Sequence, residues 1–164
     1  MKTSIVLTAA IASTLAAGPA TTARVTVTGG PNAGTYNLDA AASCEFSKEK
    51  APAPNHSFYI MLGAPNANGR TIKDTKVMTV MYLRVPDADR RTPVSQFWMA
   101  FVFGDPSHGT RYGVETRPGE KDPAGSGSVT IVQHGEAATV TFDAKTAAGI
   151  EFKGAIQCTD VLRD

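Results

Sequence analysis

The chain has 164 residues, a length typical of one domain with a core of its own. Its 16 basic and 15 acidic residues nearly balance, which argues against nucleic acid or an anionic membrane surface as a partner. Glycine and proline are plentiful, with 15 and 10 residues, and this favours many short elements joined by turns.

Residues 1–23 are predicted to be a secretory signal peptide. Lys2 supplies a short positive region, residues 5–17 are apolar, and small residues follow. This apolar run is shorter than the roughly 20 residues that a membrane-spanning helix needs. Small residues permit cleavage after Ala23, with Ala20 or Ala17 as alternatives. We therefore expect a secreted or periplasmic protein of bacterial type, with no transmembrane segment after cleavage and one domain over residues 24–164.

Short alternating or apolar segments, separated by turn-forming residues, follow along the rest of the chain. In order, they cover residues 24–28, 35–38, 44–46, 58–62, 76–85, 95–104, 110–115, 128–133, 136–144 and 150–158. Alternation of apolar and polar residues indicates half-buried strands. About nine or ten such strands predict an all-β domain and, within that class, a two-layer antiparallel β-sandwich of Ig-like or jelly-roll type. Gly113 predicts a bulge in its strand.

The most apolar of these segments, residues 95–104, is predicted to be a central strand, and it holds Trp98, the only tryptophan. Side chains alternate between the faces of a strand, so the apolar residues 97–103 make both faces apolar. Residues 77–83 have the same property. Because a two-layer sandwich needs only one apolar face per strand, the chain itself, a partner or a ligand must cover the other. We expect Tyr82 and Trp98 to be the contact residues, since aromatic side chains anchor interfaces.

Cys44 and Cys158 are the only cysteines. An exported chain with two cysteines is expected to form one disulfide bond. Neither cysteine lies in a Cys-x-x-Cys motif or beside a histidine, as redox or metal-binding pairs often do. The pair is therefore predicted to be structural and to tie the early strands to the last one.

Candidate catalytic residues are few. The three histidines, His56, His108 and His134, lie in separate loops or turns without the close spacing that zinc ligands often have, so no metal and no cofactor is expected. Asp105 and His108 lie in the segment Asp-Pro-Ser-His, which brings an acid, a hydroxyl and an imidazole together. A catalytic triad is recognised by geometry and not by adjacency. Asp105, His108 and His134 are nevertheless the candidates.

These observations favour an exported, non-catalytic domain that binds a protein partner or a small apolar ligand in the cell envelope or outside the cell. A homodimer is compatible with the same apolar faces. One alternative is an envelope hydrolase or metal-dependent enzyme, which a histidine near a carboxylate in a concave site would favour. Another is a structural or adhesive subunit, which an exposed, uncharged edge strand beside a groove would favour.

Overall fold

The computed structural model describes residues 21–40, 44–48, 56–63, 74, 76–86, 93–116 and 125–163, with the backbone alone at residues 39–40, 46–48, 56–63 and 163. This part of the chain is all-β, as predicted, with eleven strands and no helix. It accordingly offers no helix of the length and apolar character needed to cross a bilayer.

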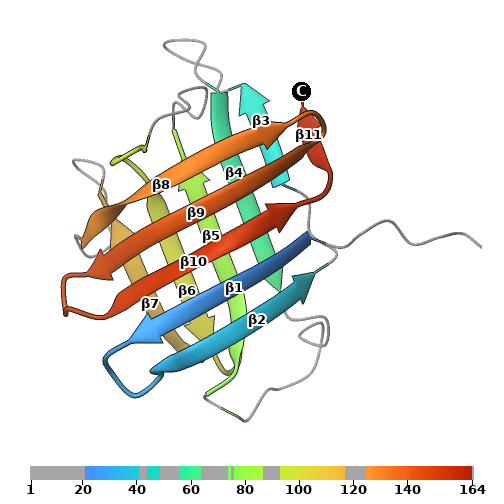
Figure 1. The fold of residues 1–164 in the computed structure, drawn as a ribbon. Helices are drawn as coiled ribbons and strands as arrows, with labels where there is room; N and C mark the ends of the chain where they lie inside the picture. Colours follow the sequence, from blue (N-terminus) through green and yellow to red (C-terminus); the bar gives the residue numbers. More distant parts are fainter. Residues whose placement is uncertain are drawn as a thin grey trace, which may run out of the picture.

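The strands form two sheets. The five-stranded sheet has the order β2-β1-β10-β9-β8 and consists of β1 (Thr21–Thr28), β2 (Gly34–Ala40), β8 (Gly125–His134), β9 (Ala137–Thr146) and β10 (Glu151–Cys158). The six-stranded sheet has the order β11-β3-β4-β5-β6-β7 and consists of β3 (Cys44–Lys48), β4 (His56–Gly63), β5 (Met78–Val85), β6 (Trp98–Phe103), β7 (Thr110–Glu115) and β11 (Val161–Arg163). The sheets lie one over the other, and their strands cross steeply (Figure 1).

The observed strands depart from the predicted ones in several respects. There are eleven rather than nine or ten, because β11 has only three residues and is too short to give an alternating pattern. β11 also pairs with β3 in parallel, whereas the other described pairs are antiparallel. Finally, β1 begins at Thr21, which lies inside the predicted signal peptide; the rest of that segment, residues 1–20, is outside the described residues.

The core lies between the two sheets. Alternate residues of β6 point into it, and Met99, Phe101 and Phe103 are fully buried. Phe101 stacks on Phe152 of the opposite sheet, with ring centroids 4.0 Å apart and planes within 6° of parallel. Stacked aromatic pairs add to the stabilisation that burial of their large apolar surfaces provides. Residues 95–104 therefore contribute a buried strand to the core, but β6 lies beside the edge strand β7 and not at the predicted centre of its sheet.

Two further contacts join the sheets. The predicted disulfide is present between Cys44 of β3 and Cys158 of β10, and both residues are buried. Near the other end of β10, the Tyr112 hydroxyl of β7 donates a hydrogen bond of 2.9 Å to Asn32 Oδ1 in the β1–β2 turn. The Tyr36 hydroxyl donates to the Asn32 carbonyl at 2.8 Å. Burial raises the pKa of both tyrosines, so their hydroxyls stay protonated and able to donate.

Loss of the disulfide should destabilise the domain substantially. The bond spans 114 residues, and the chain-entropy model assigns roughly 4–5 kcal/mol to a loop of this size. We expect the double variant Cys44→Ala/Cys158→Ala to lose about that free energy of unfolding, measured by urea denaturation. Wild type treated with a reducing agent should lose a similar amount. An unchanged urea midpoint in both cases would contradict a stabilising role.

Gly154 of β10 should not tolerate a side chain. A Cβ atom there would lie against the Arg24 carbonyl oxygen and 2.6 Å from Cζ of Phe142. Overpacking of this kind costs about 1–3 kcal/mol. We expect Gly154→Ala to lower the free energy of unfolding by that amount. Lys153→Ala, at an exposed neighbouring position, should change it by no more than about 1 kcal/mol. Equal urea midpoints for the two variants would show that the site can relax.

Candidate functional site

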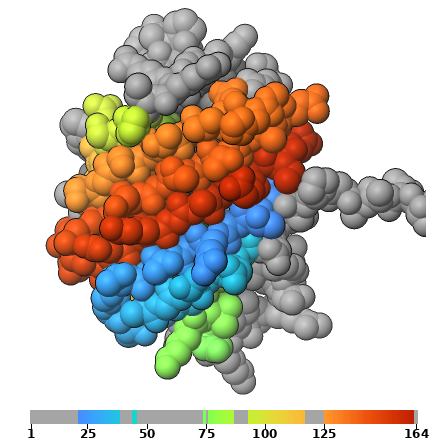
Figure 2. Space-filling model, in the orientation of Figure 1, coloured from blue at the N-terminus to red at the C-terminus, as the bar shows by residue number. Residues whose placement is uncertain are grey.

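The outer faces of the two sheets differ in chemistry. Figure 2 views the molecule onto the five-stranded sheet, whose strands form one continuous surface. Its outward residues are mostly hydroxyl-bearing and charged, for example Thr26, Thr141 and Lys153, which are all exposed. This is the usual solvated face of an antiparallel sheet. On the six-stranded sheet, by contrast, the outward positions of β5 and β6 are mostly aromatic or aliphatic.

Part of this second apolar face is already covered within the chain. Val80, Ala100 and Val102 point away from the core, yet they are only 8%, 0% and 5% exposed. Tyr82 and Trp98 on the same face remain half-buried. The apolar surface left open is therefore smaller than the alternation of the two strands predicts, and it centres on these two aromatic side chains.

Tyr82, Trp98 and Arg111 form one cluster on this face. The rings of Tyr82 and Trp98 lie 5.9 Å apart between centroids and are tilted by 40°. The Arg111 guanidinium carbon lies 5.6 Å from the Trp98 ring centroid, within the range of a cation–π interaction. The cluster thus combines two aromatic rings with a positive charge placed over one of them.

Local sequence explains how Arg111 reaches Trp98. Arg111 pairs with Val102, whereas the partner of Trp98 on β7 is Glu115. The position between them on the outer face of β7 is Gly113, which pairs with Ala100. Because neither Gly113 nor Ala100 carries a large side chain, the long Arg111 side chain has room to extend across these two residues toward the indole of Trp98.

We call the surface formed by Tyr82, Arg84, Trp98, Arg111 and Glu115 the Trp98 face. Arg84 and Glu115 pair with Trp98 from its two sides, on β5 and β7. Both arginines are exposed, whereas Glu115 is only 5% exposed. Each of the three also makes interactions elsewhere in the chain. Among the described residues, this face thus has two exposed arginines and one largely buried glutamate.

The Asp105–His108 pair lies in the β6–β7 turn and organises that turn. Asp105 Oδ1 accepts hydrogen bonds from the backbone N–H groups of Ser107 at 2.8 Å and His108 at 3.0 Å, and it lies 3.2 Å from His108 Nδ1. The Gly109 N–H donates to the Asp105 carbonyl. The backbone hydrogen bond from Ser107, assisted by His108, holds the pKa of Asp105 below its usual value. The His108 side chain is 87% exposed, so the pair is not enclosed by a concave site.

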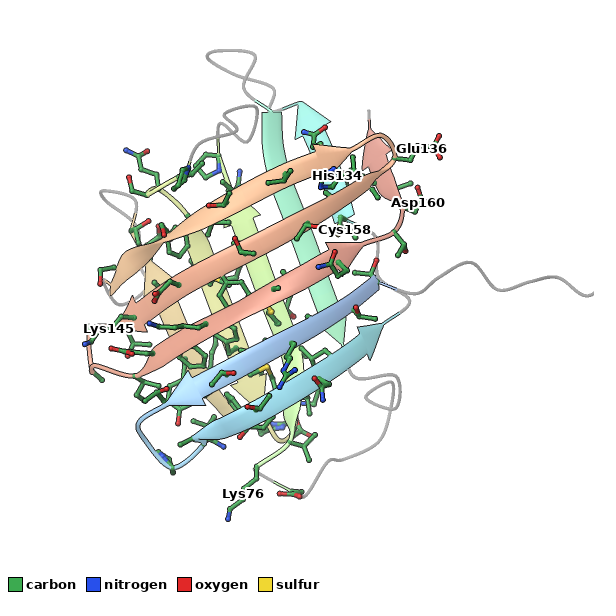
Figure 3. The ribbon with its side chains drawn as sticks, viewed as in Figure 1. Lys76, His134, Glu136, Lys145, Cys158 and Asp160 are labelled. Atoms are coloured by element: carbon green, nitrogen blue, oxygen red, sulfur yellow. A yellow bond between two sulfur atoms is a disulfide. The ribbon has the colours of Figure 1, made fainter. Side chains whose placement is uncertain are left out.

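The other histidine candidates do not join this pair. His134 ends β8 and lies near Glu136 and Asp160 at the end of the molecule where Cys158 is found (Figure 3). The β6 strand points to the lower end in Figure 1, away from the β8–β9 turn at the upper right, so His108 and His134 are far apart. The side chain of His56 lies outside the described residues. Within the described ranges, histidine, cysteine, aspartate and glutamate form no group of three that could hold a metal ion.

Strand β8 is a long edge strand without charged residues, the feature that would favour strand exchange with a partner. Its edge is partly occupied, because the Val94 and Val129 backbones exchange hydrogen bonds of 2.7 and 2.9 Å. A shallow hollow beside it is lined by Ser128, Thr130, Thr141, Phe142 and Asp143. The nearby Asp143 carboxylate forms an ion pair of 3.0 Å with Lys153 on the exposed surface. Neither the β8 edge nor this hollow presents as many tryptophan, tyrosine and arginine side chains as the Trp98 face.

Comparisons with known protein families, with characterised proteins and with solved structures find no match. The described geometry is therefore the basis for assigning a site. The sequence alone suggests Tyr82 and Trp98 as outward-facing aromatic residues, but it does not predict that Arg84 and Arg111 lie beside them. The available signal was the pairing of residues 98–103 with residues 110–115 around a short turn, which sets Arg111 and Glu115 on the same face as Trp98.

The low pKa of Asp105 gives a test of its role. We expect its carboxyl group to titrate below 3.8 in a carbon-detected NMR titration, since backbone N–H groups stabilise the carboxylate. The stability that this adds is present at neutral pH and is lost as the pH falls through the folded-state pKa. His108→Ala should keep most of the depression, because the Ser107 hydrogen bond is its largest cause. A midpoint above 3.8 in wild type would contradict the turn-forming role.

Proposed function

We propose that this chain is an exported, non-catalytic β-sandwich domain that binds a protein partner through the Trp98 face. One observation carries the proposal. On the described outer face of β5–β7, the side chains that reach the surface are those of Tyr82, Arg84, Trp98 and Arg111. Tryptophan, tyrosine and arginine are the residue types most enriched among the side chains that dominate binding energy at protein interfaces.

The packing of the cluster also suits binding. Trp98 contacts Tyr82 on one strand and Arg111 on another, so its ring is held in place before any partner arrives. Side chains that are already ordered lose less conformational entropy on association. Val80, Ala100 and Val102, on the same face of the sheet, are buried apolar residues.

Several features support the proposed class and location. Two facing sheets with a shared core fit a two-layer sandwich, and the steep strand crossing in Figure 1 is closer to orthogonal packing than to the aligned packing of Ig-like domains. The disulfide between Cys44 and Cys158 and the signal-like residues 1–20 support export, because such bonds persist in oxidising compartments.

A photo-crosslinking experiment tests the binding face. A photoreactive phenylalanine analogue is placed at Tyr82 and, as a control, at Thr141 on the opposite outer face. Exported protein irradiated in its own cell envelope or medium should give a defined adduct with one protein from position 82 and none from position 141. Excess unlabelled wild type should compete for the adduct, and Trp98→Ala protein should compete at least tenfold less well, since loss of a dominant aromatic contact costs about 2 kcal/mol or more.

The sole tryptophan reports on the same face without any partner. A half-buried Trp98 should be quenched by iodide and by caesium. Emission that neither ion quenches, together with the absence of a position-82 adduct, would rule the binding face out.

Signal cleavage is expected after Ala20 and not after Ala23. Thr22 and Ala23 of β1 pair with β2 and β10 on both sides, and Thr21 pairs with β2, so cleavage after Ala23 would remove paired, partly buried residues. Gly18 and Ala20 provide the small residues that a signal peptidase requires. Intact-mass analysis of protein exported by a bacterial host should give a chain that starts at Thr21. A chain starting at Arg24, or one retaining residues 1–20, would contradict this prediction.

A further inference from the structure

We infer that strand β11 is an edge cover, which keeps the six-stranded sheet from extending through β3 into a second copy of the chain. In the described part of the chain the sheet would end at β3 without it, because the strand order is β11-β3-β4-β5-β6-β7. An exposed edge strand presents a row of unpaired N–H and C=O groups, on which another strand can pair. β11 pairs with Cys44, Glu45 and Phe46 of the five-residue β3. It therefore occupies most of the edge that β3 would otherwise offer.

β11 is itself a poor template for a further strand. It has three residues, whereas β3 has five. Very short edge strands are one of the devices that keep sheets from pairing edge to edge. The side of β11 that faces away from β3 is also partly used, because the Val161 N–H donates to the Glu136 carbonyl at 2.8 Å. A short covering strand therefore ends the sheet where a longer one would extend it.

The backbone of Leu162 holds the cover on β3. Successive residues of a strand direct their N–H and C=O groups to opposite sides. Since Val161 directs its N–H to Glu136, Leu162 directs its own backbone groups toward β3. On β3, Cys44 and Phe46 direct theirs toward β11, because Leu162 pairs between them. Loss of the Leu162 N–H should therefore loosen the cover and leave the pairing of β3 with β4 intact.

The cover is anchored by few contacts at a fixed place. Val161 is 6% exposed and Leu162 is 49% exposed, so the first of these side chains is the buried anchor. The disulfide lies just before β11, at Cys158, and its other half, Cys44, is the residue with which Val161 pairs. Figure 3 shows Cys158 at this end of the molecule. A short tether keeps the local concentration of β11 beside β3 high. Few contacts therefore suffice to hold the cover, and a single substitution can detach it.

A second copy of the chain is the occupant that fits an uncovered β3. Two β3 strands can pair antiparallel about Phe46, and this fills both edges at once in a two-fold dimer. In that register Glu45 lies opposite Ser47. Lys48 lies opposite Cys44, so no two like charges face each other across the pair. The dimer would use the same backbone groups of Cys44 and Phe46 that now face β11.

Three variants of the full, disulfide-bonded chain test the inference by sedimentation velocity over a range of concentrations. Leu162→Pro removes the N–H that faces β3, and Val161→Asp puts a charge in place of the buried anchor. Both should dimerise at concentrations about tenfold or more below those at which wild type associates. Leu162→Thr, which keeps the N–H and suits a strand, should behave as wild type. In dilute solution the Phe46 N–H should exchange with solvent faster in the first two variants than in wild type.

Lys48→Pro distinguishes a β3 dimer from other dimers. Lys48 directs its backbone groups to the same side of β3 as Phe46, so a proline there obstructs a second β3 without removing a hydrogen bond to β4. Added to Leu162→Pro, it should restore the monomer. A dimer that persists in this double variant, or that Trp98→Ala abolishes, would overturn the inference in favour of another face. Leu162→Pro and Val161→Asp chains that both stay monomeric would overturn it too, as would thermal melting that shows both to be unfolded, since β11 would then be part of the core.

Discussion

The stacking of Phe101 on Phe152 is the contact on which the arrangement of the two sheets depends. These rings come from β6 and β10, which belong to opposite sheets, and their centroids are 4.0 Å apart. Phe101 also contacts Phe142, and Tyr112 contacts both Phe152 and Phe103. Large aromatic surfaces packed this closely fix the separation and the crossing of the sheets. The disulfide and the Asn32 hydrogen bonds then join the sheets near the two ends of β10.

This constraint decides which residues of β6 face outward. Side chains alternate along a strand, so burial of Met99, Phe101 and Phe103 sends Trp98, Ala100 and Val102 to the other face. A shift of one residue in the register would bury the tryptophan and expose the phenylalanines, at the expense of the stacked core. The position of Trp98 is therefore a consequence of core packing, although its environment is set by the neighbouring strands.

Sequence patterns predicted the features that depend on alternation and on chain-wide counts. The all-β class and the pairing of Cys44 with Cys158 are of this kind, and the structure confirms them, whereas the strand of residues 95–104 lies beside the edge of its sheet and not at the predicted centre. The patterns failed where the outcome depends on register or on very short elements. β11 has three residues and pairs in parallel. Gly113 predicted a bulge, yet the β6–β7 register runs through it without interruption, and the irregularity lies in β5 between Met78 and Val80.

Gly113 explains why the sequence predicted the aromatic residues of the Trp98 face but not the position of Arg111 beside them. A glycine in a strand signals either a bulge or the close approach of another group, and the sequence does not distinguish the two. Here the missing side chain leaves room beside Ala100 for Arg111 to extend toward the indole. The cluster thus needs two small residues as much as it needs the aromatic ones. The cluster forms only when β5, β6 and β7 pair in this register. The burial of the phenylalanines of β6 places Trp98 on the outer face, and the neighbouring strands place the arginines around it.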